Sequence, residues 1–180
     1  KRSNPPILFT HFLTTADGLR AATMFFNEAF RGILALDRMQ EKTLNSIDQP
    51  DSVDPDFVGI FYPTDDNAYF GTNFLIEADE ALVLEGDAPN VDYWSVALMN
   101  RWMRTFDYET YKVDLNNKSI KVKDGRFKII IAHKEPPAEA GIENWLETGG
   151  LKHGLVTFRY QLYKGIEMPT ATLVKLKDLK

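Results

Sequence analysis

The sequence of 180 residues contains no cysteine. This absence excludes a disulfide framework, a site where thiolates bind a metal, and a cysteine nucleophile. The cellular compartment stays open, because a chain without cysteine folds equally well in reducing and in oxidising surroundings. The sequence therefore assigns no localisation.

Long apolar runs and an excess of positive charge are also missing. No apolar run reaches the roughly 18 residues that a membrane-spanning helix needs, and no signal-peptide pattern opens the chain. The 21 lysines and arginines stand against 26 acidic residues, which gives a formal net charge of -5. Because binding to phosphates needs a basic surface, we expect a soluble protein whose main partner is neither a nucleic acid nor a membrane.

Known signatures of catalysis and metal binding are absent as well. The chain has no G-x-S-x-G elbow and no His-Glu-x-x-His pair. His133 and His153 could hold zinc or iron together with a nearby glutamate, but their spacing matches no known ligand motif. We therefore expect no metal and no cofactor, and the sequence leaves open whether the protein is an enzyme.

The composition that is present indicates a globular protein. Hydrophobic residues make up 44% and charged residues 26%, which is ordinary, whereas 12% aromatic residues is a high fraction. The length suits one domain with its own core. The first residue is Lys1 and not methionine, so a missing upstream domain is one interpretation, and a homo-oligomer is also open.

The N-terminal part predicts a helix over residues 16–47. No proline interrupts this stretch, and apolar residues recur in it at steps of three and four, namely Leu19, Ala22, Phe26, Phe30, Ile33 and Leu36. Gly32 could bend or divide the helix. We assign residues 1–48 to an N-terminal helical segment.

Residues 49–66 predict an acidic linker or loop. Six aspartates and three prolines lie between Asp48 and Asp66. Asp54-Pro55-Asp56 invites a calcium-binding interpretation, but the glycine and the closing glutamate of a helix-loop-helix calcium site are missing. A loop around a short strand at residues 58–62 is the favoured interpretation.

Residues 67–180 predict a β-sandwich domain. Short segments rich in β-branched or aromatic residues follow one another here, at 69–76, 81–85, 93–99, 119–123, 127–132, 154–162 and 170–176. Asp124-Gly125 between two of them is a strong hairpin signal. The fold class we predict is mainly β (α+β), an antiparallel jelly-roll-like β-sandwich with an N-terminal helix packed on it.

A first candidate site follows the predicted strand at residues 93–99. Apolar side chains alternate along this strand and end at Met99, which indicates that both of its faces are largely covered. Polar and aromatic side chains then gather at its far end, namely Asn100, Arg101, Trp102, Arg104 and Asp107. A solvated turn at the end of the strand is the alternative interpretation.

A second candidate site is the long polar loop at residues 133–153. Loops of this length in compact domains are often functional. The side chains that could contact a ligand there are His133, Asn144, Trp145 and Glu147. We predict that this loop packs against residues 100–108, so that both patches line one aromatic pocket with a polar rim.

The two arginines of the first patch carry a structural prediction. In an extended chain, residues three apart point to opposite faces, so either Arg101 or Arg104 should turn inward. A buried guanidinium needs a carboxylate partner, for which Asp107 and Glu147 are the candidates.

Both patches belong to a series of motifs spread over residues 69–176. In order, these motifs are Glu80-Ala81-Leu82-Val83-Leu84-Glu85-Gly86, Tyr93-Trp94-Ser95-Val96, Asn100-Arg101, Asp107-Tyr108, Asp124-Gly125, Ala132-His133, Asn144-Trp145-Leu146 with Thr148, and Pro169-Thr170. With this series the sequence resembles the domain of unknown function 1214 family. The resemblance implies a jelly-roll-like β-sandwich that forms the C-terminal part of larger bacterial proteins, and it implies no established activity.

The loop after residue 132 departs from that family pattern. Glu135-Pro136-Pro137 stands in place of an aspartate-proline-glycine turn, Glu147 replaces an aspartate, and residues 138–141 lengthen the loop. A role that requires the shorter aspartate side chain is therefore not assigned to Glu147. The N-terminal helical segment lies outside the resemblance.

The function we predict is a module that binds a small organic or carbohydrate-like ligand or mediates assembly. Aromatic faces with amide and guanidinium rims suit sugars and planar organic molecules. The alternative is an enzyme that acts on such a ligand with a histidine and a carboxylate as its acid-base pair.

Overall fold

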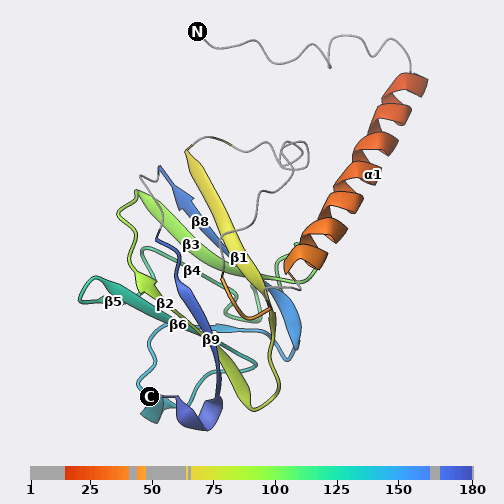
Figure 1. Ribbon diagram of the computed structural model, residues 1–180. Coiled ribbons are helices and arrows are strands. Elements are labelled where there is room, and N and C mark those ends of the chain that lie inside the picture. The colour runs from red at the N-terminus through yellow and green to blue at the C-terminus, as the bar shows by residue number, and fades with distance from the viewer. Residues whose placement is uncertain (1–14, 41–43, 48–63, 65, 163–166, 180) are drawn as a thin grey trace.

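The computed structural model describes residues 15–40, 44–47, 64, 66–162 and 167–179 (Figure 1). A long helix precedes nine strands in this part of the chain. Their bounds are α1 Thr15–Gln40, β1 Asn67–Leu75, β2 Glu80–Asp87, β3 Tyr93–Met99, β4 Asp114–Asn116, β5 Val122–Lys123, β6 Arg126–Ala132, β7 Trp145–Glu147, β8 His153–Gln161 and β9 Thr170–Lys175. Two short 3-10 turns are also present, η3 Ala138–Ala140 and η4 Leu176–Asp178.

The strands form two sheets, which confirms the predicted sandwich of mainly antiparallel strands with one N-terminal helix. The first sheet has the order β1-β8-β3-β4, and the second has the order β5-β6-β2-β9. β7 pairs with β6 in parallel and is the exception to the antiparallel arrangement. The jelly-roll character of the strand connections stays a prediction.

The core lies between the two sheets and is rich in aromatic rings. Along β3, Trp94, Val96 and Leu98 point into it and are buried, while the residues between them are half-buried on the outer face. The rings of Phe70 and Phe158 stack with their centroids 5.0 Å apart. Alternating inward side chains therefore hold the first sheet against the second, as the pleat of a strand requires.

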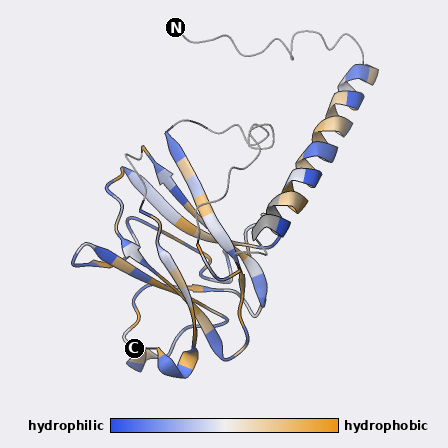
Figure 2. Cartoon of the chain, viewed as in Figure 1, coloured by the Kyte–Doolittle hydropathy of each residue, from blue (hydrophilic) through white to orange (hydrophobic). Residues whose placement is uncertain are grey.

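The second sheet is covered on its outer face as well. Ala81, Val83, Ile130 and Ala132 are buried there under a small apolar cluster that consists of Ile142, Trp145, Val174, Leu176 and Leu179. Figure 2 shows hydrophobic residues along the strands of this sheet. Burial on both faces explains why β6 is an almost continuous apolar run and not an alternating one.

The predicted hairpin is confirmed between β5 and β6. Asp124 and Gly125 both have positive φ, at 51° and 77°, as a two-residue type I′ turn requires. The strand predicted at residues 119–123 is shorter than expected, because Asn116 and Ser119 close a turn before it. The Ser119 backbone N–H donates to the Asn116 carbonyl at 2.9 Å.

The predicted helix is confirmed as α1, and Gly32 does not interrupt it. Its predicted extension to residue 47 is wrong, because residues 44–47 lie in a turn and in coil beside β1. Asn45 fixes that turn: its side-chain oxygen accepts the N–H of Leu75 at 2.9 Å, and its amide donates to the Leu75 carbonyl at 3.0 Å. A turn forms here and not a further turn of helix, because the Asn45 side chain hydrogen-bonds the backbone N–H and carbonyl of Leu75 in the edge strand β1.

The later part of α1 contacts the sandwich. Phe30 stacks on Trp102 with ring centroids 5.8 Å apart, and Gly32 is buried. The earlier turns project away from the sheets (Figure 1).

No helix among the described residues is both long and apolar enough to cross a membrane. The short strand predicted at 58–62 and the Asp54-Pro55-Asp56 motif lie outside the described residues.

Candidate functional site

An open depression lies where β3 ends and β8 begins. Its volume is about 580 Å³, and its lining residues are Asn100, Arg104, Thr105, Phe106, Asp107, Tyr108, Glu109, Tyr111, Thr148, Gly149 and Leu151. The lining comes from two segments, the chain after β3 and the turn between β7 and β8. That turn, which is part of the loop 133–153, therefore lines the same depression as residues 100–109.

A reverse turn held by Asn100 shapes one side of the depression. The Asn100 side-chain oxygen accepts the backbone N–H groups of Trp102 at 2.9 Å and Arg104 at 3.1 Å. Met103 has a φ of 60°, and Thr105 returns to bridge with the last residue of β3. The chain is therefore not extended beyond β3.

This turn overturns the prediction that one arginine of the pair is buried. Arg101 and Arg104 are both exposed. The Arg101 guanidinium lies 6.0 Å from the centre of the Trp102 ring. Arg104 lines the depression, and its guanidinium forms no ion pair or hydrogen bond with another residue in the described ranges. The prediction failed because it assumed that the strand alternation continues past β3.

Asp107 organises the next turn. One carboxylate oxygen accepts the Thr110 hydroxyl at 2.7 Å, and the other accepts the Glu109 N–H at 3.1 Å. The Thr110 hydroxyl, followed by the Glu109 N–H, lowers the pKa of Asp107 below its usual value. The Asp107 carbonyl accepts the N–H of Tyr111 at 2.9 Å, so this turn also sets the position of that ring.

A glycine turn forms the other side of the depression. The Leu151 N–H donates to the Thr148 carbonyl at 3.1 Å, and the two residues between them have positive φ, 60° for Gly149 and 84° for Gly150. The ring of Tyr111 lies against Gly149 so closely that a β-carbon there would come within 2.9 Å of it. Glycine is required at this position by both the backbone and the packing.

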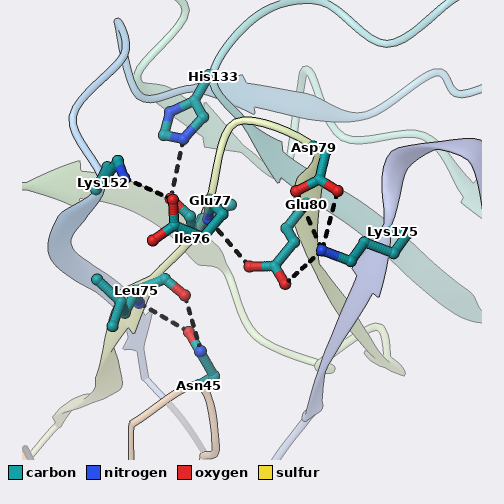
Figure 3. A network of polar contacts seen from close by, with 9 residues as sticks. All are labelled: Asn45, Leu75, Ile76, Glu77, Asp79, Glu80, His133, Lys152 and Lys175. Atoms are coloured by element: carbon teal, nitrogen blue, oxygen red, sulfur yellow. Dashed lines mark hydrogen bonds and ion pairs between the residues drawn. The ribbon is translucent and has the colours of Figure 1, made fainter.

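His133 supports the depression from inside the fold. Its Nε2 lies 3.0 Å from the Ile76 carbonyl, to which it donates (Figure 3). In the neutral imidazole Nδ1 therefore accepts the Thr148 hydroxyl at 2.6 Å. Both ring nitrogens are thereby used to connect the end of β6 with the β1–β2 loop and the glycine turn. His133 does not line the depression, although Thr148 does.

Exposed ion pairs surround the β1–β2 loop (Figure 3). Lys175 pairs with Asp79 and Glu80, and Lys152 pairs with Glu77. The Glu77 backbone N–H, and then Lys175, lower the pKa of Glu80, whereas the Asp79 and Glu80 carboxylates raise the pKa of Lys175. Pairs of this kind contribute little to stability because water screens them.

The remaining predicted residues serve the second sheet. Asn144 is 4% exposed, and its side chain accepts the Lys121 N–H at 2.7 Å and donates to the carbonyls of Lys121 at 2.8 Å and Lys128 at 3.0 Å. Trp145 covers the outer face, with the Lys112 ammonium 4.9 Å from its ring centre. The Glu147 N–H donates to the Lys112 carbonyl at 2.7 Å.

The structure thus gathers three of the predicted residues, Asn100, Arg104 and Asp107, in the depression. Arg101 and Trp102 do not line it, and Trp102 stacks instead on Phe30 of α1. The expected set did not include Thr105, Phe106, Tyr108, Glu109, Tyr111, Thr148, Gly149 and Leu151. Two signals point to part of this group: the glycine pair that follows Thr148, and the Asp-x-x-Thr pattern that begins at Asp107.

The charged groups of the depression are one guanidinium, from Arg104, and two carboxylates, from Asp107 and Glu109. No histidine lines it, so the acid-base alternative finds no imidazole among these residues. Within the described ranges, no three histidine, aspartate or glutamate side chains gather as a metal site would require. The arrangement offers hydrogen-bond donors, acceptors and tyrosine rings to a ligand.

These features define the class as a two-sheet β-sandwich domain with a preceding helix and a polar, tyrosine-lined depression at one end. The chain belongs to the family described as Protein of unknown function (DUF1214), whose profile matches residues 62–164. The resemblance seen in the sequence is thereby confirmed.

Two solved structures are similar to this chain. An uncharacterized protein from Burkholderia cenocepacia shares 28% identity with a TM-score of 0.68, over 77% of this chain and 37% of that one. The VPA0106 protein from Vibrio parahaemolyticus shares 22% identity with a TM-score of 0.48, over 61% of this chain and 31% of that one. This chain therefore spans little more than a third of the length of the Burkholderia protein. None of the curated proteins matches it.

Proposed function

We propose that the protein is a binding module that takes a small, neutral, hydroxyl-rich organic or carbohydrate-like ligand in the depression. One observation carries the proposal: two segments distant in sequence line a common hollow of about 580 Å³, in which the Arg104 guanidinium has no partner among the described residues. An unpaired guanidinium beside carboxylates and tyrosine rings offers the donors, acceptors and apolar faces that a sugar uses.

The charge of the lining supports a neutral ligand over a strongly anionic one. The two carboxylates of Asp107 and Glu109 outnumber the single guanidinium of Arg104 and would repel an anionic ligand at short range. Both Asp107 oxygens already accept hydrogen bonds within their turn. In this arrangement Arg104 and Glu109 contact ligand hydroxyls, and the rings of Tyr108 and Tyr111 supply flat surfaces.

The other candidate residues act through this lining. Asn100 holds the turn that presents Arg104, and His133 positions Thr148. Arg101 and Trp102 lie outside the lining, next in sequence to Asn100. We assign Asn144, Trp145 and Glu147 to the support of β7, which carries the glycine turn.

A titration with a matched pair of variants tests this proposal. Mono- and disaccharides are screened by ligand-observed NMR, and the affinity of each binder is measured for the unmodified protein, Arg104→Ala and Arg101→Ala. We expect Arg104→Ala to weaken binding at least tenfold, because it removes charge-assisted hydrogen bonds worth about 1.5–3 kcal/mol. Arg101→Ala should retain the affinity. Equal affinities in all three proteins would contradict the proposed site.

Membership in a longer bacterial protein is part of the same proposal. The length of the Burkholderia relative supports it, since the match covers 37% of that chain. In such a protein the module would bind its ligand beside a further domain. The mass of the native polypeptide, measured from its source organism, tests this part independently of ligand binding.

A further inference from the structure

Trp102, shortly after the end of β3, is an exposed aromatic residue on which α1 packs. It is 49% exposed, and Phe30 of α1 stacks on its ring at an interplanar angle of 12° with the centroids 5.8 Å apart. Stacked rings at this separation are an arrangement that aromatic pairs prefer. Among the described residues, no other aromatic ring contacts Trp102. This pair therefore connects α1 to the segment that follows β3.

The backbone of Trp102 is in turn tied to Asn100. The Trp102 N–H donates to the Asn100 side-chain oxygen at 2.9 Å, and the Arg104 N–H donates to that same oxygen at 3.1 Å. One acceptor atom therefore holds both ends of the segment from Trp102 to Arg104. A contact that fixes Trp102 also restricts Arg104, which lines the depression.

The turn between these two donors has a backbone conformation that needs support. Met103 has a φ of 60°, a region that few residues other than glycine adopt. Such conformations persist where the surrounding contacts determine them. The hydrogen bonds of the turn run between its own residues, as when the Met103 N–H donates to the Asn100 carbonyl at 2.9 Å. The stack of Phe30 on Trp102, in contrast, connects the turn to another element.

A second contact anchors the chain that follows α1 on the sandwich. The Asn45 side chain accepts the N–H of Leu75 at 2.9 Å and donates to the Leu75 carbonyl at 3.0 Å. Ile47, only 8% exposed, belongs to the core between the sheets. The later part of α1 lies against the sandwich between these anchors and the free turns of the helix (Figure 1). Phe30 is therefore presented to Trp102 from an element that is itself attached to the first sheet.

We infer that Phe30 is a positioning residue of the binding site: through its stack on Trp102, α1 holds the Asn100 turn in the conformation that presents Arg104. Phe30 does not line the depression, so it acts through Trp102 and Asn100 and not by touching a ligand. The effect on affinity rests on the proposed function, whereas the hold of α1 on the turn does not. Because coupling is reciprocal, a ligand that engages Arg104 strengthens the docking of Phe30 to the same extent.

Hydrogen exchange tests the hold of α1 on the turn without any ligand. In Phe30→Ala the amides of Trp102 and Arg104 should exchange about two to ten times faster, the range that the loss of one aromatic pair supports. Phe26→Ala is the matched control, since Phe26 is 70% exposed on the same helix and its ring packs on Phe25. It should leave both amides unchanged. Unchanged exchange at both amides in Phe30→Ala overturns the inference.

Affinity measurements test the consequence for the site. For a mono- or disaccharide that binds in the screen, Phe30→Ala should raise the Kd by about two- to tenfold. Phe26→Ala should keep the affinity of the unmodified protein, and so should Phe30→Tyr, because it retains a stacking ring. An unchanged Kd in Phe30→Ala, or a loss that Phe30→Tyr does not reverse, overturns the inference.

The two measurements separate this inference from the proposed function. If no saccharide binds the unmodified protein, the proposed function fails. Faster exchange at Trp102 and Arg104 in Phe30→Ala would then still support the hold of α1 on the turn, and unchanged exchange would overturn it.

Discussion

At the scale of single residues, the polar groups that attract attention in the sequence divide into ligand-facing and fold-supporting groups. Arg104 faces the depression, but Asn144 satisfies the backbone of the second sheet, and His133 uses both nitrogens inside the fold. The sequence shows which residue types are present. Their partners lie 15 to 57 positions away, so the sequence alone could not distinguish the two uses.

Asn144 gives the first residue-level prediction. Asn144→Ala should lower the free energy of unfolding by about 1–3 kcal/mol, because it removes the part-buried hydrogen bonds that the Asn144 side chain makes with the backbone of Lys121 and Lys128. Asn90→Ala, at an exposed amide, serves as the control and should change stability by less than about 0.5 kcal/mol. Urea denaturation measures both, and equal effects would contradict a structural role for the Asn144 amide.

Asp107 gives a prediction about pH. The Thr110 hydroxyl lowers the pKa of Asp107, so Thr110→Val should move that pKa back up toward its usual value near 4. Because the folded-state pKa lies below the unfolded one, the contribution to stability is fully present above about pH 4 and is lost as pH falls through the folded value. NMR titration of the Asp107 carboxyl carbon measures the shift. An unchanged pKa in Thr110→Val would show that the hydroxyl is not its main cause.

At the scale of elements, strong local patterns predicted the long helix and the longer strands, whereas the shortest strands were not predicted. The alternation in β3, the three-and-four spacing in α1 and the Asp124-Gly125 turn each act within a few residues, and all three are confirmed. β4 and β7 have three residues each and exist because a neighbouring strand pairs with them. Such elements depend on tertiary partners, which no local pattern encodes.

The turn between β7 and β8 gives the prediction at this scale. Gly149→Ala should destabilise the protein by about 2–4 kcal/mol, since it adds strain at positive φ and a clash with the Tyr111 ring. Gly125→Ala is the matched control: it also has positive φ, but its β-carbon would meet no atom within 4 Å. It should cost about 1–2 kcal/mol. Thermal unfolding measures both variants. An equal loss of stability in Gly149→Ala and Gly125→Ala would mean that Tyr111 does not pack on the turn.

At the scale of the whole molecule, sheet pairing brings the two candidate patches together. Met99 at the end of β3 pairs with Leu155 near the start of β8. The segment that follows β3 and the segment that precedes β8 therefore meet at the same end of the sheet. The sequence predicted that both patches exist and that they meet. It could not predict which side chains share the depression, because the reverse turn after β3 changes the direction of every residue that follows.

Chemical-shift mapping shows directly whether a ligand binds in this depression. The backbone amides of the 15N-labelled protein are monitored while a saccharide identified in the screen is added. We expect the shifts to concentrate at residues 100–111 and 148–151, and we expect Arg104→Ala to remove them while Arg101→Ala does not. Shifts centred on another surface, or shifts that persist in Arg104→Ala, would contradict it.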